Sequence, residues 1–430
     1  MKGEIMAVCY LFANYEVQYK CEYILKKEFI EVDIDYDIEK EIETENGIIL
    51  WGNNIKFEER DILIIDSQNK TNYLLKNAYY AGRSSIYGTP DGGSKTKFRT
   101  INYFKHGNYE KLIDLKTMPK VSRIRVFSKS INKLIGYPSL KMEKSDKEYV
   151  IKLSKEKSNK SISLNNDGIK DIVVSDDWTS KREKTGNLII NFNGYIEITL
   201  TKRNNYTEVS SFVNELVIFM QLYFPDNFSV DKIWCMVDEN YYELITNQME
   251  VKCTKRYTEK TVEVGLLEFL SNCYNKIPYR KSKNEIRNIP YIVINTSRNI
   301  EDNFLMFYRF IECYYKKQNI TNIRKRFVSY SIRNNYASAI NWTDEQIESY
   351  SQEITCLRNH YVHSGYFIKN SSLKISFEKI DGKKNPKDYT VSNLNISWIY
   401  ERTKILYRIT LDIIFREMLG YDDYNFEKRF

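Results

Sequence analysis

The spacing of the apolar residues changes from alternation to a helical period near residue 300, and this change constrains the fold more than any other feature. Before residue 300, short apolar runs and turn residues follow one another, for example in residues 62–65 and 149–153. Beyond it, apolar side chains recur every three or four residues. We therefore expect an α+β chain whose parts differ in architecture. The expected parts are a β-rich, sandwich- or barrel-like domain (1–205), a mixed α/β segment with a linker (206–290) and a C-terminal helical bundle (291–430).

Turn residues divide the first part into expected hairpins. The clearest is residues 188–200, in which Asn193-Gly194 is the signal of a type I′ turn. Residues 47–57 contain two apolar runs around a pair of asparagines, and in the mixed middle segment a second hairpin is expected in residues 232–245, about Glu239-Asn240. Residues 83–97 are polar and glycine-rich, and they read as a surface loop because they lack both phosphate-binding glycine motifs.

Helical periodicity and capping residues define the helices that we expect. Thr343 and Gln346 have the spacing of a capping box, and Gly420 follows the last periodic residues. Residues 370–390 are a polar excursion between two of these helices. The expected helices are 210–223, 265–274, 301–317, 321–340, one that begins at Thr343, and 397–418.

Composition narrows the classes of function. The formal net charge of +8 favours acidic partners. The seven cysteines form no CxxC pair, so we expect free thiols, no metal site and no cofactor. The N-terminus has no signal-peptide pattern, and the strongest apolar run, 216–224, is interrupted by Gln221 and too short to cross a bilayer. We therefore expect a cytoplasmic protein without a membrane partner.

One segment concentrates residues that carry chemistry. Residues 356–367, CLRNHYVHSGYF, hold two of the three histidines in the chain. The buried seam expected for this helix leaves out Arg358, Asn359 and His363, so core packing does not account for them. The seam consists of Ile347, Tyr350, Ile354, Leu357 and Tyr361.

These residue types suit RNA cleavage without a metal ion. RNA carries its own nucleophile, the 2′-OH next to each phosphate. Histidine can accept or give a proton near neutral pH, and a guanidinium can bind the charge that gathers on the phosphorane. Asn359 can orient the imidazole or bond to a phosphate oxygen. On an ideal helix, however, Arg358 and His363 diverge by about 140°. A two-fold dimer with two facing copies, or a bend at Ser364-Gly365, would bring such groups together.

The RNHYVH segment resembles the Arg-Asn-x3-His form of the motif of the HEPN superfamily. The preceding helix, FLMFYRFIECYYKK, resembles the first HEPN helix, with Glu312 at its centre. The overall layout is similar to that of ApeA-type anti-phage abortive-infection proteins. The resemblance implies a small helical bundle, usually dimeric, with metal-independent endoribonuclease activity. It assigns catalysis to Arg358, Asn359 and His363.

The resemblance also implies partners. We expect RNA as substrate, tRNA or another cellular RNA, a homodimer or higher even oligomer formed through the C-terminal bundle, and a phage-derived trigger at the N-terminal domain. His360 lies in the variable part of the motif and receives an RNA-contact role, and Glu312 a supporting one. Arg326 and Arg333 add positive charge to a neighbouring helix, as a solvated or an RNA-facing surface.

Two other hypotheses stay open. The first is a non-catalytic HEPN-like module that binds RNA, a nucleotide or a protein. The second is a lectin-like or ligand-sensing protein whose function lies in the β-rich domain. A Ser-His-Asp hydrolase is disfavoured, because His106 and the two motif histidines are the only candidate bases and no GxSxG elbow is present. No helix-turn-helix is signalled either.

Overall fold

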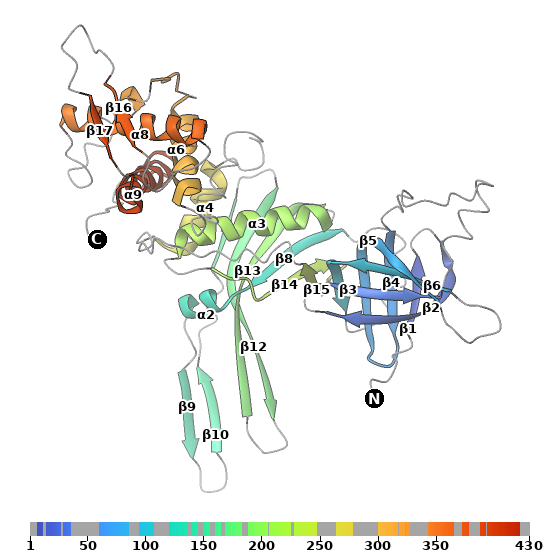
Figure 1. Ribbon diagram of the computed structural model, residues 1–430. Helices are drawn as coiled ribbons and strands as arrows, with labels where there is room; N and C mark the ends of the chain where they lie inside the picture. The colour runs from blue at the N-terminus through green and yellow to red at the C-terminus, as the bar shows by residue number, and fades with distance from the viewer. Residues whose placement is uncertain are drawn as a thin grey trace. The chain divides into compact units, whose positions relative to one another are not determined.

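The computed structural model forms two compact units (Figure 1). The first comprises Met1–Asn214 and Ser229–Val251, and the second comprises Glu215–Phe228 and Lys252–Phe430. The segment expected to be a separate mixed part, 206–290, thus contributes to both. The structure describes residues 7–11, 14–26, 29–35, 60–85, 94–106, 120–135, 139–144, 149–154, 160–164, 168–182, 188–204, 206–224, 228–246, 264–277, 300–316, 318–322, 324–326, 343–364, 372–377, 388–392 and 394–421.

The first unit begins with strands that close into a barrel. Its ring of antiparallel pairs runs β5-β4-β1-β2-β3-β6 and returns to β5, because β5 pairs with β4 along one stretch and with β6 along another. β7 pairs with β5 as well. Closure leaves no free strand edge in the ring. The strands are β1 (Ala7–Leu11), β2 (Asn14–Leu25), β3 (Ile30–Ile34), β4 (Arg60–Asp66), β5 (Thr71–Ser85), β6 (Ser94–Thr100) and β7 (Asn102–His106).

Alternation along these strands builds the core of the barrel. On β3, Ile30, Val32 and Ile34 are fully buried and belong to the hydrophobic cluster that fills the ring. β5 serves several neighbours because its register shifts twice, and Gly82 has a φ of +137° at the second shift. β5 and β6 also occupy both ends of the segment expected to be a loop, 83–97, so that only 86–93 lie outside the described residues.

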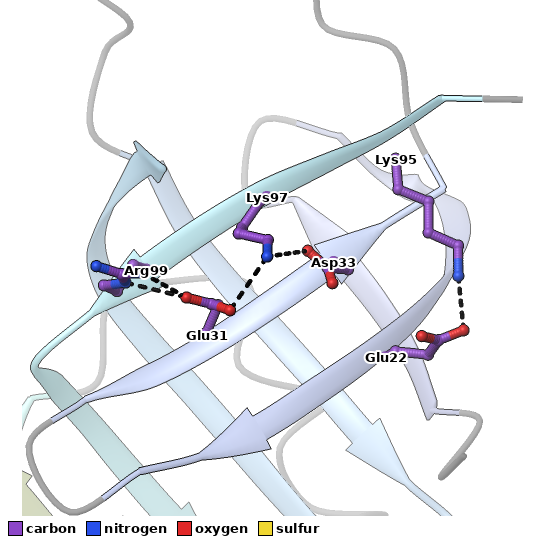
Figure 2. A network of polar contacts seen from close by, with 6 residues as sticks. All are labelled: Glu22, Glu31, Asp33, Lys95, Lys97 and Arg99. Carbon is purple, nitrogen blue, oxygen red and sulfur yellow. Dashed lines mark hydrogen bonds and ion pairs between the residues drawn. The ribbon is translucent and has the colours of Figure 1, made fainter. Parts of the chain in front are cut away.

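Charged side chains line the outer face where β3 meets β6 (Figure 2). Glu31 accepts hydrogen bonds from Arg99, the closer at 2.6 Å, and lies 3.2 Å from Lys97. Lys95 reaches Glu22 of β2 at 2.6 Å. Burial raises the pKa of Glu31, but Arg99 and Lys97 outweigh it and hold that pKa below its ordinary value. Opposite charges directly across paired strands stabilise this register.

The same sheet extends beyond the barrel in the order β7-β15-β14-β8-β13-β12-β11. The expected hairpin in residues 232–245 is confirmed, although its turn lies at Asp238-Glu239, where both φ angles are positive, as a type I′ turn requires. Helix α2 (Lys129–Ile135) and a separate ribbon of β9 (Ser139–Lys144) and β10 (Tyr149–Ser154) also belong to the unit. The other strands are β8 (Val121–Phe127), β11 (Lys160–Ser163), β12 (Ile169–Arg182), β13 (Leu188–Asn204), β14 (Lys232–Val237) and β15 (Asn240–Thr246).

The prediction of a hairpin at Asn193-Gly194 is wrong. β13 runs without a break from Leu188 to Asn204 and pairs from Leu188 to Leu200 with β12. Gly194 serves close packing instead: a Cβ there would lie 2.8 Å from Oδ1 of Asn132 and 3.0 Å from Ile131 on α2. The backbone N–H of Gly194 also donates a hydrogen bond to Asn132. The glycine marks a helix that approaches the strand, not a turn.

The second unit is built mainly from helices. The capping box is confirmed: the Thr343 N–H donates to Gln346 at 2.9 Å, and the Gln346 N–H donates to the Thr343 hydroxyl at 3.3 Å. Gly420, with φ of +76°, follows the last helix, as expected. The helices are α3 (Tyr206–Tyr223), whose second half belongs here, α4 (Leu266–Lys276), α6 (Ile300–Lys316), α8 (Asp344–Ser364), α9 (Ile396–Asp412) and the π-helix η3 (Ile413–Met418).

Aromatic side chains hold these helices together. Phe307 of α6 packs on Tyr407 of α9 with ring centroids 5.0 Å apart. The ring centroid of Phe269 on α4 lies 6.4 Å from that of Phe415 on η3 and 5.1 Å from that of Tyr223 on α3. The apolar stripe expected on α6 is buried throughout: Phe304, Phe307, Tyr308, Ile311 and Tyr315.

The polar excursion 370–390 is more ordered than its composition indicates. Its ends form two short antiparallel strands, β16 (Leu373–Ile375) and β17 (Tyr389–Val391), and Leu373 and Ile375 are buried. The expected runs in 47–57 and most of the expected helix 321–340, with Arg333, lie outside the described residues. The expected combination of a barrel-like β-rich N-terminal part with C-terminal helices is confirmed at that level.

Candidate functional site

The residues of the motif lie on different faces of helix α8 and differ in burial. The expected seam is largely confirmed, since Ile347, Tyr350, Ile354 and Leu357 are all buried. Arg358 is half-buried, on the side of α8 that approaches α6. Asn359 and His363 are exposed.

Arg358 is held by neutral neighbours. Its Nη1 donates a hydrogen bond to Oδ1 of Asn359 at 3.0 Å. The guanidinium carbon lies 5.9 Å from the ring centroid of Tyr308 on α6. Within the described part of the chain, Arg358 makes no ion pair with a carboxylate. The amide of Asn359 orients the guanidinium, and no carboxylate among the described residues neutralises it.

Several other arginines of this unit have acidic partners. Arg326 lies 3.8 Å from Glu312, and Arg402 donates a hydrogen bond to Glu353 at 2.8 Å. Arg324 lies 3.6 Å from Glu348. The contrast separates Arg358 from arginines that serve to join helices.

Glu312, expected in a supporting role, and Arg326, expected on a solvated or RNA-facing surface, act together with Arg358 on the pKa of Tyr308. Burial and then the Glu312 carboxylate raise the pKa of the Tyr308 hydroxyl, while Arg358, Arg326 and a hydrogen bond with Thr355 oppose that rise. Arg326 is 4% exposed and donates a hydrogen bond to the carbonyl of Ile320 at 3.0 Å. This burial favours a structural role for Arg326 over contact with RNA.

The two histidines of the motif lie near the C-terminal end of α8. His363 lies in the last turn of α8, which ends at Ser364, and within the described residues it makes no hydrogen bond or ion pair. His360 is half-buried on the same helix. The structure therefore joins Arg358 to Asn359 and Tyr308, and it leaves His363 accessible at the end of the helix. Arg333 lies outside the described residues.

Sequence reasoning missed the polar contacts on the opposite side of α8. Glu353, 9% exposed, accepts hydrogen bonds from Tyr389 of β17 and Arg402 of α9. Tyr350 donates its hydroxyl proton to the Arg402 carbonyl at 3.0 Å. These bonds fix α8 against two other elements, and thus the orientation of the motif. They join residues far apart in sequence, so local patterns did not reveal them.

Comparison with known proteins gave no match to a family model and no significant match to a curated protein or to a solved structure. No helix in the described ranges is long and apolar enough to cross a membrane. Among the same residues, no three side chains of His, Cys, Asp or Glu gather as metal ligands would.

Proposed function

We propose that this chain is an endoribonuclease that cuts RNA by attack of the 2′-OH on the neighbouring phosphate, with Arg358, Asn359 and His363 as its catalytic residues. The observation that carries the proposal is the state of Arg358. Its guanidinium is oriented by a neutral amide at 3.0 Å and has no carboxylate partner among the described residues. A half-buried arginine of this kind suits a phosphate better than it suits helix packing.

The reaction assigns a task to each group. The 2′ oxygen forms a bond to phosphorus, its proton passes to a base, and the bond from phosphorus to the 5′ oxygen breaks as that oxygen gains a proton. His363, exposed in the last turn of α8, carries one of these protons. Arg358 stabilises the charge on the phosphorane oxygens, and Asn359 holds its guanidinium in place. No step uses a metal ion.

Arg358 and His363 make no contact with one another within the described residues, which agrees with their divergence along a helix. We propose that two chains meet about a two-fold axis through the C-terminal helices and that each supplies an Arg358 and a His363 to a shared site. By its resemblance to ApeA-type proteins, the chain would act on tRNA or another cellular RNA in anti-phage defence, in the cytoplasm. A phage-derived trigger would act at the N-terminal unit.

Incubation of the purified full-length chain with total RNA tests this function. We expect cleavage by the wild type and a loss of rate of about 10²–10⁴ in His363→Ala, because a general acid or base contributes that much. Arg309→Ala removes an exposed arginine from α6 and serves as the control. If the wild-type chain and both variants bind RNA but do not cleave it, the result would favour the non-catalytic alternative and contradict the proposal.

A further inference from the structure

One face of the extended sheet in the first unit carries a row of aromatic rings. Phe127 lies between Tyr195 and Trp234, with ring centroids 5.3 Å and 5.0 Å away, and Trp234 continues the row to Tyr241 at 6.4 Å. These residues come from β8, β13, β14 and β15, which are neighbours in the sheet. We call them the aromatic row. Tyr195, Trp234 and Tyr241 are only half-buried, whereas the opposite face of the same strands is buried.

An arginine inside the row is locked in place. The Arg125 guanidinium lies between two rings, 3.9 Å from the centroid of Tyr241 and 4.7 Å from that of Tyr195. Its Nε donates to Glu197 at 2.5 Å, and the Tyr241 hydroxyl donates to the same carboxylate oxygen at 2.6 Å. Glu197 is 9% exposed, and its negative charge is neutralised within this cluster. The rings are thus held in a fixed arrangement, which lowers the entropy cost of binding a flat ligand.

Two cationic side chains with accessible charge lie beside the row. Arg123, 47% exposed, follows the same face of β8 and reaches Glu197 only at 3.5 Å. Lys232 is exposed and lies directly opposite Phe127, so it projects from that face too. Glu243, also on this face, lies opposite the exposed Lys105, which offsets it.

We propose that the aromatic row, with Arg123 and Lys232, is a binding surface for single-stranded nucleic acid. Bases stack on Tyr195, Trp234 and Tyr241, and the phosphates meet Arg123 and Lys232. Fixed aromatic rings flanked by cationic side chains bind single strands with little preference for sequence. A neutral sugar would also stack on the rings, but it would make no use of the flanking charges. The inference concerns a different unit from the catalytic residues and does not rest on their activity.

Binding of a labelled oligothymidylate to the full-length chain, followed by fluorescence anisotropy, tests the proposal. DNA has no 2′-OH, so binding is measured apart from cleavage. Trp234→Leu keeps an apolar side chain but removes the ring, and it should weaken binding at least about fivefold. Trp234→Phe retains a ring face and should stay closer to the wild type. Arg123→Gln should weaken binding and lower the slope of log Kd against log salt by about 1.

Arg203→Gln is the matched control, because Arg203 lies on β13 away from the row and is paired with Asp238 at 3.2 Å. It should leave the affinity close to that of the wild type. Thermal melting of each variant shows whether it folds, and Tyr195→Leu replaces Trp234→Leu if the latter does not. Affinity unchanged by loss of either ring overturns the proposal, as does binding of a neutral oligosaccharide in place of the oligonucleotide. A chain that binds through these residues but cuts no RNA supports it and overturns only the proposed function.

Discussion

The guanidinium of Arg358 donates a hydrogen bond to Oδ1 of Asn359, the next residue of α8, across 3.0 Å. An amide can orient a guanidinium as a carboxylate does, but it leaves the positive charge intact. Arg402 of α9 differs, because it donates to the carboxylate of Glu353 on α8 at 2.8 Å. That arginine joins two helices, and the carboxylate neutralises its charge.

Asn359→Asp should therefore reduce cleavage more than Asn359→Ala. A carboxylate beside Arg358 would neutralise the guanidinium and repel the phosphate, whereas alanine only removes the orienting bond. We expect a loss of about 10²–10³ for the aspartate variant, comparable to the loss of one charge-stabilising donor. Single-turnover rates on one RNA substrate would measure it. If the aspartate variant cut as fast as the wild type, Arg358 would not be binding phosphate.

Arg358→Ala should lower the cleavage rate by about 10²–10³ with little change in stability, because the side chain is not part of the buried seam. Arg402→Ala offers a contrast in the same unit. It leaves the buried Glu353 without its cation, so it should destabilise the fold by about 3 kcal/mol. Denaturant unfolding and cleavage assays on both variants separate these effects. An Arg358→Ala chain that is unfolded would instead give Arg358 a structural role.

Mixing of subunits tests the shared site. An Arg358→Ala, His363→Ala double variant, added in excess to the wild type and allowed to exchange, should reduce activity as heterodimers form, since each site needs both chains. Native mass spectrometry would count the heterodimers. Activity that stays proportional to the amount of wild-type chain, in a mixture rich in heterodimers, would mean that each chain cuts alone.

The lowered pKa of Asp66 predicts that its contribution to stability depends on pH. Burial raises the pKa of its carboxyl, but hydrogen bonds from Tyr23 and Asn69 outweigh it and hold that pKa below its ordinary value. The unfolded chain therefore binds the proton more readily. The stabilisation is present above the ordinary pKa and is lost as pH falls through the folded one. Asp66→Asn should lose about 1–3 kcal/mol at neutral pH and much less in acid.

Urea unfolding at several pH values checks the prediction for Asp66. Asp171→Asn is the control, because Asp171 accepts its hydrogen bond from Ser163 on the exposed surface. Equal losses for Asp66→Asn at neutral and acid pH would show that the carboxylate does not contribute through its charge.

Gly194→Ala should destabilise the first unit by about 1–3 kcal/mol, because the new Cβ would press on Asn132 and Ile131. Gly265→Ala is the comparison, since a Cβ at Gly265 meets nothing within 4 Å. That change should cost less than about 1 kcal/mol, the loss of a preferred residue at a helix start. Thermal melting distinguishes the two variants. Equal melting temperatures would mean that α2 yields to the added methyl group.

Local patterns predicted local structure well. The capping box at Thr343 and Gln346, the buried stripe of α6 and the glycine after the last helix were all foreseen, because each depends on residues only a few positions apart. Asn193-Gly194 misled for the same reason. The pair is a strong turn signal by itself, but the approach of α2 to that glycine is not visible in the neighbouring sequence.

Long-range partners set the limit of prediction at the site. The motif identified Arg358, but it could not show that Asn359 bonds to it or that Tyr308 of α6 lies beneath its guanidinium. The bonds of Glu353 to Tyr389 and Arg402 cross 36 and 49 residues. The pairing of β14 with β8 likewise joins distant segments, so no periodicity signalled the aromatic row.

The chemical ends of the RNA products test the central claim most directly. The full-length chain would be incubated with a defined RNA in excess EDTA, and the fragments analysed by mass spectrometry. Attack by the 2′-OH predicts cleavage that survives EDTA and leaves a 2′,3′-cyclic phosphate on one fragment and a 5′-OH on the other. Fragments with a 5′-phosphate, or activity abolished by EDTA, would contradict the account.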